Sequence, residues 1–228
     1  MKHLGATTLI LLLSSCAATP MREDQARSMV AAQDQQIGVQ SRCCTTIEEM
    51  NPAQISSGIG DYTLGSASPI VSLDGRPTTA SLFALPAGST GRKLEFVSYS
   101  DRKRSAFRFD SVLFVAPTFV FLDSSRKQVA VEAQLPLCWG AKSGHGGIWT
   151  RSLIPDNAAY VMVAARTDRT AFGIDTRQLD LAAPAMEAIA EARQSYLTQV
   201  GTGYSGLYSL ELIDPSAPPL GRCSASAP

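Results

Sequence analysis

The longest apolar run in the sequence extends from Val112 to Leu122. A strand made of these residues would be apolar on both faces, so it would have to be buried on both sides, as in the middle of a layered β domain. Pro117 lies inside the run and has no N–H to donate to a neighbouring strand. We therefore expect either two strands here or one strand broken at a bulge.

Short apolar runs separated by turn residues continue on both sides of this segment, which is typical of an all-β domain. The expected strands are Tyr62–Leu64, Pro69–Leu73, Ser81–Leu85, Lys93–Tyr99, Tyr160–Ala165 and Tyr208–Leu212. Asp74-Gly75 marks a turn after the second of these. Val129 and Val131 alternate with polar residues, and we expect them to face the core. The predicted fold is mainly β: a β-sandwich of short antiparallel strands over residues 43–214.

One α-helix is predicted over residues 184–200, before the last strand. Pro184 suits the first helical turn, and Gly201 suits the C-terminal cap. Residues 136–157, rich in glycine and tryptophan, are expected to form loops. Residues 215–228 form a tail rich in Pro, Ser and Ala, which we expect to be held in place only if Cys223 is bonded.

The N-terminus has the three parts of an export signal, over residues 1–15. Lys2 and His3 are a short basic start, Leu4–Leu13 is an apolar core, and Ser14 and Ser15 are the small residues that precede a cleavage site. The core is shorter than the roughly 20 apolar residues that a membrane-spanning helix needs. We therefore expect the signal to be removed.

A cysteine follows the small residues directly, which predicts a lipoprotein signal. Cys16 would become the mature N-terminus, with a thioether to diacylglycerol and an acylated amine such as a palmitoyl amide; two or more acyl chains anchor stably. Ala17 is not the aspartate that retains lipoproteins in the inner membrane. The prediction is a Gram-negative protein anchored on the periplasmic face of the outer membrane, with residues 16–42 as lipidated N-terminus and polar tether.

The charge balance argues against nucleic acid as a partner. The chain has 20 basic and 20 acidic residues, and loss of Lys2 with the signal leaves 19 against 20. Proteins that bind nucleic acid need a basic excess to neutralise phosphates. The length after signal removal suits one domain of moderate size.

Four cysteines remain after Cys16: Cys43, Cys44, Cys138 and Cys223. An even number in an oxidising compartment predicts disulfides, with three complete pairings open. Because the termini of a domain are often close, a bond from Cys43 or Cys44 to Cys223 is favoured. A zinc site is disfavoured because its ligands would have to cluster at short spacing. No metal and no cofactor are predicted.

The motifs that resemble catalytic sites are incomplete. His145 lies in Gly144-His145-Gly146-Gly147, similar to an esterase oxyanion turn, but no Gly-x-Ser-x-Gly nucleophile motif occurs in the sequence. Gly201–Gly206 matches a dinucleotide-binding pattern, but it follows a predicted helix rather than a strand. We therefore predict that the chain is not an enzyme, with a glycan or peptidoglycan hydrolase as the disfavoured alternative.

A cluster of aromatic residues offers a different function. Aromatic faces pack on the apolar faces of sugar rings, and two tryptophans flank the glycine-rich loop. The candidate ligand surface consists of Trp139, His145, Trp149, Tyr204 and Tyr208. The alternative interpretation is that the tryptophans are partly buried and seal the sandwich.

Several segments together resemble the maltose-operon periplasmic protein (MalM) family. They are Ser81–Gly88, Phe114–Asp123, Ala159–Val163 with Arg166–Asp168, and Gly206–Leu212. The resemblance covers most of residues 43–214 and implies an exported, non-enzymatic envelope protein connected with maltodextrin uptake. Unlike the family, this chain has a lipoprotein signal and cysteines, and it lacks a long Ala/Pro-rich extension.

The expected function is therefore binding or scaffolding in the cell envelope. The partners would be the membrane, through Cys16, and either maltodextrins or envelope proteins. An alternative role is a structural or docking subunit of an envelope complex.

Overall fold

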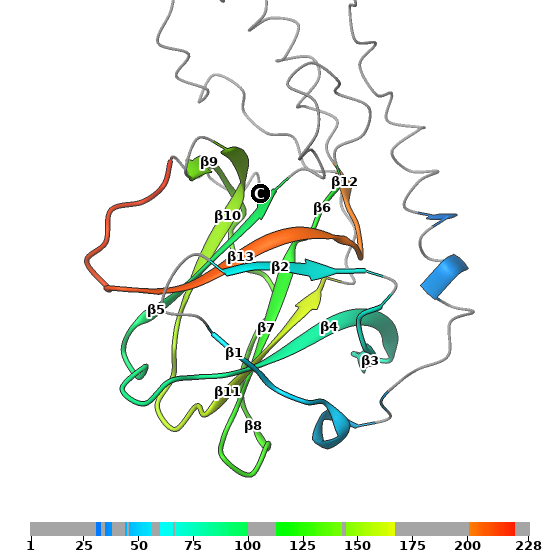
Figure 1. Ribbon diagram of the computed structural model, residues 1–228, viewed down its shortest axis with the longest axis horizontal. Coiled ribbons are helices and arrows are strands. Elements are labelled where there is room, and N and C mark those ends of the chain that lie inside the picture. Colours follow the sequence, from blue (N-terminus) through cyan, green and yellow to red (C-terminus); the bar gives the residue numbers. More distant parts are fainter. Residues whose placement is uncertain are drawn as a thin grey trace, which may run out of the picture.

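The computed structural model describes residues 31–32, 35–37, 44, 46–55, 60–65, 67–99, 113–142, 145–166 and 201–221. Over these residues the chain is mainly β, with two larger sheets, and the predicted β-sandwich class is confirmed (Figure 1). The predicted helix at 184–200 lies outside the described residues, as do Cys16, Cys43 and Cys223. Among the described residues, no helix has the length and apolar content to cross a bilayer.

The first sheet has six strands in the order β1-β4-β11-β7-β8, with β3 paired to the start of β4. Its strands are β1 (Ala53–Gln54), β3 (Ile70–Leu73), β4 (Arg76–Ala84), β7 (Pro117–Leu122), β8 (Gln128–Glu132) and β11 (Tyr160–Ala165). Only β1 pairs in parallel, with the end of β4. The predicted turn between β3 and β4 is confirmed: Asp74 and Gly75 have φ of 51° and 76°, as a tight β-hairpin requires.

The second sheet has five antiparallel strands in the order β2-β13-β5-β10-β9. Its strands are β2 (Gly60–Leu64), β5 (Lys93–Tyr99), β9 (Cys138–Lys142), β10 (His145–Leu153) and β13 (Gly206–Ile213). A 3₁₀ turn, η1 (Ile47–Glu49), precedes β1.

The apolar run around Pro117 forms two strands, which is one of the two outcomes expected from the sequence. β6 (Leu113–Phe114) pairs in parallel with β12 (Gly201–Thr202), and β7 begins at Pro117. Between them, the N–H of Val115 donates to the Ser98 hydroxyl, at 2.9 Å. The proline therefore marks the point where the chain leaves one pairing and enters another.

Aromatic residues fill the space between the two sheets. Phe96 and Tyr208 stack with ring centroids 5.0 Å apart, and Phe83 meets Tyr62 edge to face at 4.7 Å. Phe96 also packs on Phe119 of the opposite sheet. Such ring pairs add stability beyond the area that they bury, and they fix which face of each strand points inward.

The outer faces of both sheets are covered as well. On the six-stranded sheet, Met50 and Val71 pack over Val120, Leu122 and other outward-pointing residues of β4, β7 and β11. This second layer explains why every residue of β7 is buried. A sheet with one solvated face would instead alternate apolar and polar side chains.

The prediction that Val129 and Val131 face the core is wrong. They lie on β8, the edge strand, with exposed fractions of 40% and 39%. Ala130 packs against the core instead. The register of β7 and β8 shifts between Phe121 and Leu122, so β8 is irregular where it pairs. The alternating pattern correctly predicted a strand, but the pairing of β8 with β7 determined which face of β8 is buried.

The predicted loop at 136–157 is also wrong for most of its length, since β9 and β10 form a hairpin there. Gly147 shows why its glycines fit a strand. A Cβ on Gly147 would lie 2.3 Å from the backbone oxygen of Ser98 on β5. The residue is a glycine because another strand passes too close for any side chain.

Candidate functional site

The outer face of the five-stranded sheet is covered by residues 214–221, which we call the C-terminal strap. The strap leaves β13 and turns back over the sheet toward β9 (Figure 1). Glu95, Trp149 and Arg151 lie on this face of β5 and β10. Together they form the candidate site.

Arg151 connects the sheet to the strap. Its Nε and Nη2 donate to Oε2 of Glu95 at 2.8 and 2.6 Å, and the two residues face each other across β10 and β5. Its Nη1 and Nη2 also donate to the carbonyl oxygens of Ala217 and Pro218 at 2.9 and 2.7 Å. Glu95 is only 2% exposed, so its charge is compensated within the protein. The buried Glu95 carboxylate therefore orients the Arg151 guanidinium, and this guanidinium binds main-chain carbonyls of the strap.

An apolar patch adjoins this ion pair. Val97, Cys138 and Trp149 are buried together, with Tyr99 and Leu220 packed against them. The guanidinium carbon of Arg151 lies 5.2 Å from the centroid of the Trp149 ring, within range of a cation–π interaction. Leu220 brings the end of the strap to this patch, so the strap is held by both polar and apolar contacts.

The beginning of the strap is fixed by a turn and by two cations. The Ser216 hydroxyl and N–H both donate to Oδ1 of Asp214. These hydrogen bonds lower the pKa of Asp214. Lys93 Nζ donates to the Pro215 carbonyl, and Arg92 Nη2 donates to the Leu212 carbonyl, each at 2.7 Å. Every one of these cation contacts is to a main-chain oxygen, which any extended peptide presents.

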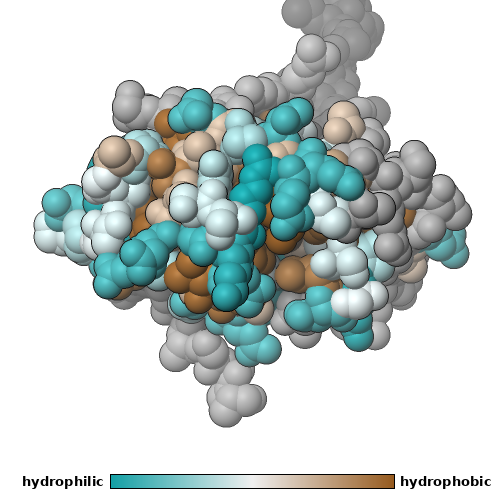
Figure 2. Space-filling view, turned by 90° about the horizontal axis from the view of Figure 1, so that it is seen from below, coloured by the Kyte–Doolittle hydropathy of each residue, from teal (hydrophilic) through white to brown (hydrophobic). Residues whose placement is uncertain are grey.

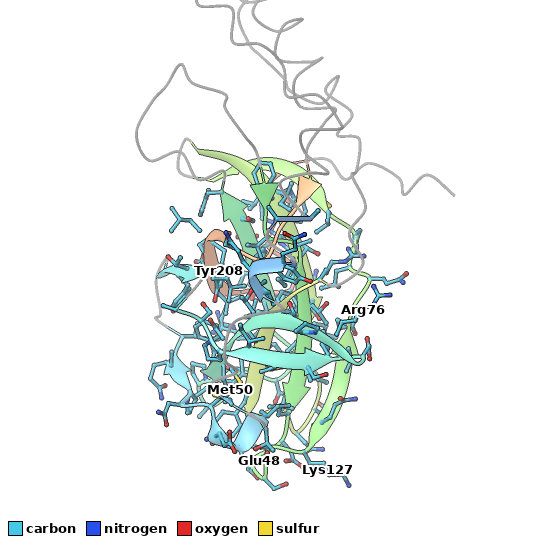
Figure 3. All side chains as sticks on the ribbon, turned by 90° about the vertical axis from the view of Figure 1, so that its right-hand side faces the viewer. Glu48, Met50, Arg76, Lys127 and Tyr208 are labelled. Carbon is cyan, nitrogen blue, oxygen red and sulfur yellow. The ribbon has the colours of Figure 1, made fainter. Side chains whose placement is uncertain are left out.

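A second terminal segment covers the other sheet. We call Cys44 and residues 46–55 the N-terminal strap. Nη1 of Arg126, in the β7–β8 turn, donates to the carbonyls of Ile47, Glu48 and Met50. Figure 3 shows Glu48 and Lys127 at the same end of the molecule, where η1 meets this turn. The Arg126 guanidinium also lies 5.6 Å from the Tyr160 ring centroid. The Ile47 carbonyl also accepts the Met50 N–H within the turn, so the guanidinium adds a second hydrogen bond there and binds the two carbonyls that follow at the end of the turn.

The surface at this end of the molecule is mixed. In Figure 2, hydrophilic residues cross the face seen from below, with apolar patches between them. Val129 and Val131 on β8 are exposed apolar residues of the described chain. Scattered apolar residues of this kind are common on protein surfaces, so they do not define a site by themselves.

Three of the five residues of the predicted aromatic surface are buried, at two different places in the fold. Tyr204 and Tyr208 are buried in the core between the sheets, and Trp149 is buried on the outer face beneath the C-terminal strap. Tyr208 is fully buried, and its ring stacks on Phe96. Trp139 pairs in register with Ile148, and His145 pairs with Lys142 at the start of β10. The three described rings are therefore not presented together to solvent.

Three buried polar atoms have no hydrogen-bond partner within the described residues: Trp149 Nε1, Thr150 Oγ1 and Tyr208 Oη. Burial raises the pKa of Tyr208 far above its usual value, so the phenol stays protonated at neutral pH. A neutral, enclosed hydroxyl in an aromatic core does not act as a base or nucleophile there. The described residues also contain no cluster of three His, Cys, Asp or Glu side chains that would hold a metal ion.

Two of the predicted disulfide cysteines are oxidised: Cys44 and Cys138 are each disulfide-bonded. Cys44 packs with the residues of the six-stranded sheet's outer face, and Cys138 packs beside Trp149 on the five-stranded sheet. The tail after residue 214 was expected to depend on Cys223 alone, but residues 214–221 have their own contacts with the sheet.

Sequence reasoning missed Glu95 and Arg151. A signal was present, because Glu95 interrupts the apolar strand Leu94-Glu95-Phe96-Val97. A charged residue within such a strand is buried only with a partner. The partner could not be identified, because Arg151 lies in a segment that was interpreted as a loop.

Comparison with family models, with curated proteins and with solved structures gives no match for this chain.

Proposed function

We propose that the chain is a lipid-anchored protein of the outer membrane whose β-sandwich faces the periplasm and binds or scaffolds without catalysis. Support for the anchor comes from the sequence, where small residues and Cys16 follow a short apolar segment. Support for a binding role comes from Arg151 of the candidate site and from the neighbouring Lys93, which both contact main-chain oxygens of the C-terminal strap. No step of bond making or breaking is needed for this function.

The observation that supports binding most directly is the contact between Arg151 and the C-terminal strap. A guanidinium held by the buried Glu95 carboxylate is pre-oriented, so little side-chain entropy is lost when it binds carbonyl oxygens. Trp149 provides an apolar ring beside it. This chemistry suits a proline-containing extended polypeptide, as in the strap itself.

A polypeptide partner is therefore favoured over a maltodextrin. A sugar site of the predicted kind needs exposed aromatic faces, whereas Trp149, Tyr204 and Tyr208 are buried. The resemblance to the MalM family motivates a test of sugar binding, but it is not by itself evidence for sugar binding. Of the proposed roles, the contacts of Arg151 with the C-terminal strap favour that of a docking subunit of an envelope complex.

The N-terminal strap gives the anchor a mechanical role. Arg126 binds three carbonyls of the strap, and Met50 and Ile55 are buried in it. The tether from Cys16 would thus end on a fixed part of the sandwich. The domain would stay close to the membrane and orient its partners there.

The anchor is tested by replacing Cys16 with serine. In the native host, the unchanged protein should fractionate with membranes and show the mass of an acylated chain that starts at residue 16. The Cys16→Ser variant should be soluble in the periplasm. A Cys44→Ser variant is the control, since it also replaces a cysteine by serine but leaves residue 16 unchanged. An intact chain that retains residues 1–15 would overturn the proposal.

The choice between sugar and polypeptide is tested by titration. Maltodextrins added up to millimolar concentration should change neither tryptophan fluorescence nor heat. Saturable binding would favour the sugar role and contradict the preference for a polypeptide partner. Calorimetry is needed besides fluorescence, because a buried Trp149 reports poorly on binding elsewhere.

A further inference from the structure

The outer face of the five-stranded sheet presents its side chains in rows that run across the strands. Val97 of β5, Trp149 of β10 and Cys138 of β9 lie opposite one another and form an apolar row. Two residues along each strand, Glu95 and Arg151 form the next row. Because residues paired in register, and residues two apart on a strand, point to the same side of a sheet, the apolar row and the charged row share this face.

The C-terminal strap lies on both rows without joining the sheet as a strand. Arg151 donates to the carbonyls of Ala217 and Pro218, and Leu220 packs on the apolar row. Pro218 and Pro219 have no N–H, so they bring no donor that would need a partner on this face. The face therefore recognises carbonyl oxygens and one apolar side chain, and the prolines keep the segment extended.

The strap leaves one donor of the site unsatisfied. Nε1 of Trp149 is buried and has no hydrogen-bond partner in the described part of the chain. An indole N–H can only donate, so it needs an acceptor such as a carbonyl oxygen. A buried donor without an acceptor is costly. A segment that presents a further carbonyl to Trp149 therefore binds this face more tightly than the strap does.

We propose that the outer face of β5 and β10 binds proline-rich segments of other envelope polypeptides, and that the C-terminal strap occupies this site as an intramolecular competitor. The inference rests on the proposed function and adds the class of partner and its regulation. The segment that fits has two adjacent prolines followed by an apolar residue, as in residues 217–220. Such a segment is extended before it binds, so little conformational entropy is lost.

The strap can be displaced because most of it is exposed. Residues 214–216, 218 and 219 are exposed, and Leu220 is the strap residue that joins the apolar row. The strap competes mainly because it is attached, which gives it an effective concentration of roughly millimolar order. A change that weakens the contact of Leu220 should therefore open the site to a free peptide.

Peptide titration tests the site. An end-blocked, fluorescein-labelled peptide with the sequence of residues 214–221 is added to the full-length parent and to Leu220→Ser, and its anisotropy is measured. Leu220→Ser leaves Trp149 and Arg151 in place, so its Kd for the peptide should be about tenfold lower than that of the parent. Val129→Ser is the control, since it removes an exposed apolar side chain from the other sheet, and it should behave as the parent. Equal Kd values for Leu220→Ser and the parent would overturn the competition by the strap.

Changes in the peptide and in Arg151 test what the face recognises. A peptide with alanine at both adjacent prolines should bind Leu220→Ser about fivefold more weakly, because it gains two N–H groups and a freer backbone. Equal binding would overturn the proline-rich class while leaving a polypeptide role intact. In the same background, Arg151→Lys keeps the charge but loses the planar fork, and the Kd should rise about tenfold. Near-UV circular dichroism checks that this variant is folded; a folded variant with an unchanged Kd would overturn the site.

Trp149→Phe in the Leu220→Ser background tests the unsatisfied donor. This change keeps an aromatic ring and removes Nε1. The Kd of the strap peptide should stay within about twofold, because the strap does not bond this atom. The tightest peptide from a library with random residues around Pro-Pro-Leu should bind about tenfold more weakly, because its further carbonyl loses the donor. A library peptide that binds both proteins equally would overturn the part assigned to Trp149.

A second copy of the chain is the competing occupant. Sedimentation should show a monomeric parent with and without the peptide, whereas a dimer that dissociates on adding the peptide would assign the face to a second copy's strap. The titrations do not require an acylated Cys16. Peptides that fail to bind, while membrane fractionation still depends on Cys16, would overturn this inference and leave the anchor standing.

Discussion

The two straps cover the two sheets by different physical means. The N-terminal strap buries large apolar side chains, including Met50 and Ile55, and Arg126 binds its carbonyls from a partly exposed turn. The C-terminal strap buries little of its own, and it is held mainly by Arg151, Lys93 and Leu220. Apolar burial resists any local opening, whereas a cover held by a few directed bonds can be displaced by a competitor with the same bonds. The C-terminal strap is therefore the one suited to move.

Removal of Arg151 should have the largest effect on stability. Arg151→Met removes the guanidinium that donates two hydrogen bonds to the buried Glu95 carboxylate, so the free energy of unfolding should fall by about 4 kcal/mol. Urea unfolding followed by circular dichroism measures this change. The double variant Arg151→Met/Glu95→Gln should recover much of the loss, because the buried negative charge is removed together with the guanidinium.

Arg92→Met is the matched control for Arg151, since Arg92 is an exposed arginine that also bonds a carbonyl, that of Leu212. It should cost less than about 1 kcal/mol. If Arg92→Met and Arg151→Met cost the same, the buried ion pair has no special role on this face.

Truncation of Met50 should rank second. Met50→Ala removes a buried side chain from the patch over Val120 and Met162, and the expected cost is about 3 kcal/mol. The N-terminal strap should also become more sensitive to proteases, while the C-terminal strap should not. A loss well under 1 kcal/mol would contradict the view that apolar burial holds the N-terminal strap.

Removal of the Arg126 guanidinium should cost less, about 2 kcal/mol, because the side chain is partly exposed and water can replace some of its bonds. Arg126→Met keeps an apolar stem of similar length. The backbone here is left-handed, with φ of 63°, and neither arginine nor methionine is a glycine, so the substitution adds no new backbone strain. Lys127→Met is the control, since Lys127 is the adjacent, exposed cation of the same turn. The comparison is made by thermal and urea unfolding; equal effects of the two variants would mean that general charge matters and the carbonyl contacts do not.

The smallest effect is expected from acid at the beginning of the C-terminal strap. The hydrogen bonds from Ser216 lower the pKa of Asp214, so the folded state favours the ionised form. The resulting stabilisation is present above the unfolded pKa, near 3.8, and is lost as the pH falls through the folded value. The stability difference between the parent and Asp214→Asn should therefore shrink as the pH falls below 4. A difference in the free energy of unfolding that stays constant from pH 6 to pH 2 would contradict this prediction.

Particular residues show where sequence reasoning succeeds and fails. Pro117 predicted an interruption of the strand pairing, by a break or a bulge, because a missing N–H acts locally whatever surrounds it. The prediction that Val129 and Val131 face the core was wrong, because the face that a strand buries depends on its partner strand and its register. Trp149 appeared to belong to a loop, and its strand became visible only with β5 and β9 beside it.

The sequence alone determined the mainly β class and the main strands of the core. These follow from local rules, since side-chain periodicity, proline chemistry and turn residues act over a few positions. Only the tertiary structure decided that both outer faces are covered, that Glu95 meets Arg151 across 56 residues of sequence, and that Cys44 and Cys138 lie on opposite sides. Such contacts depend on which distant strands become neighbours, and a linear pattern does not contain that information.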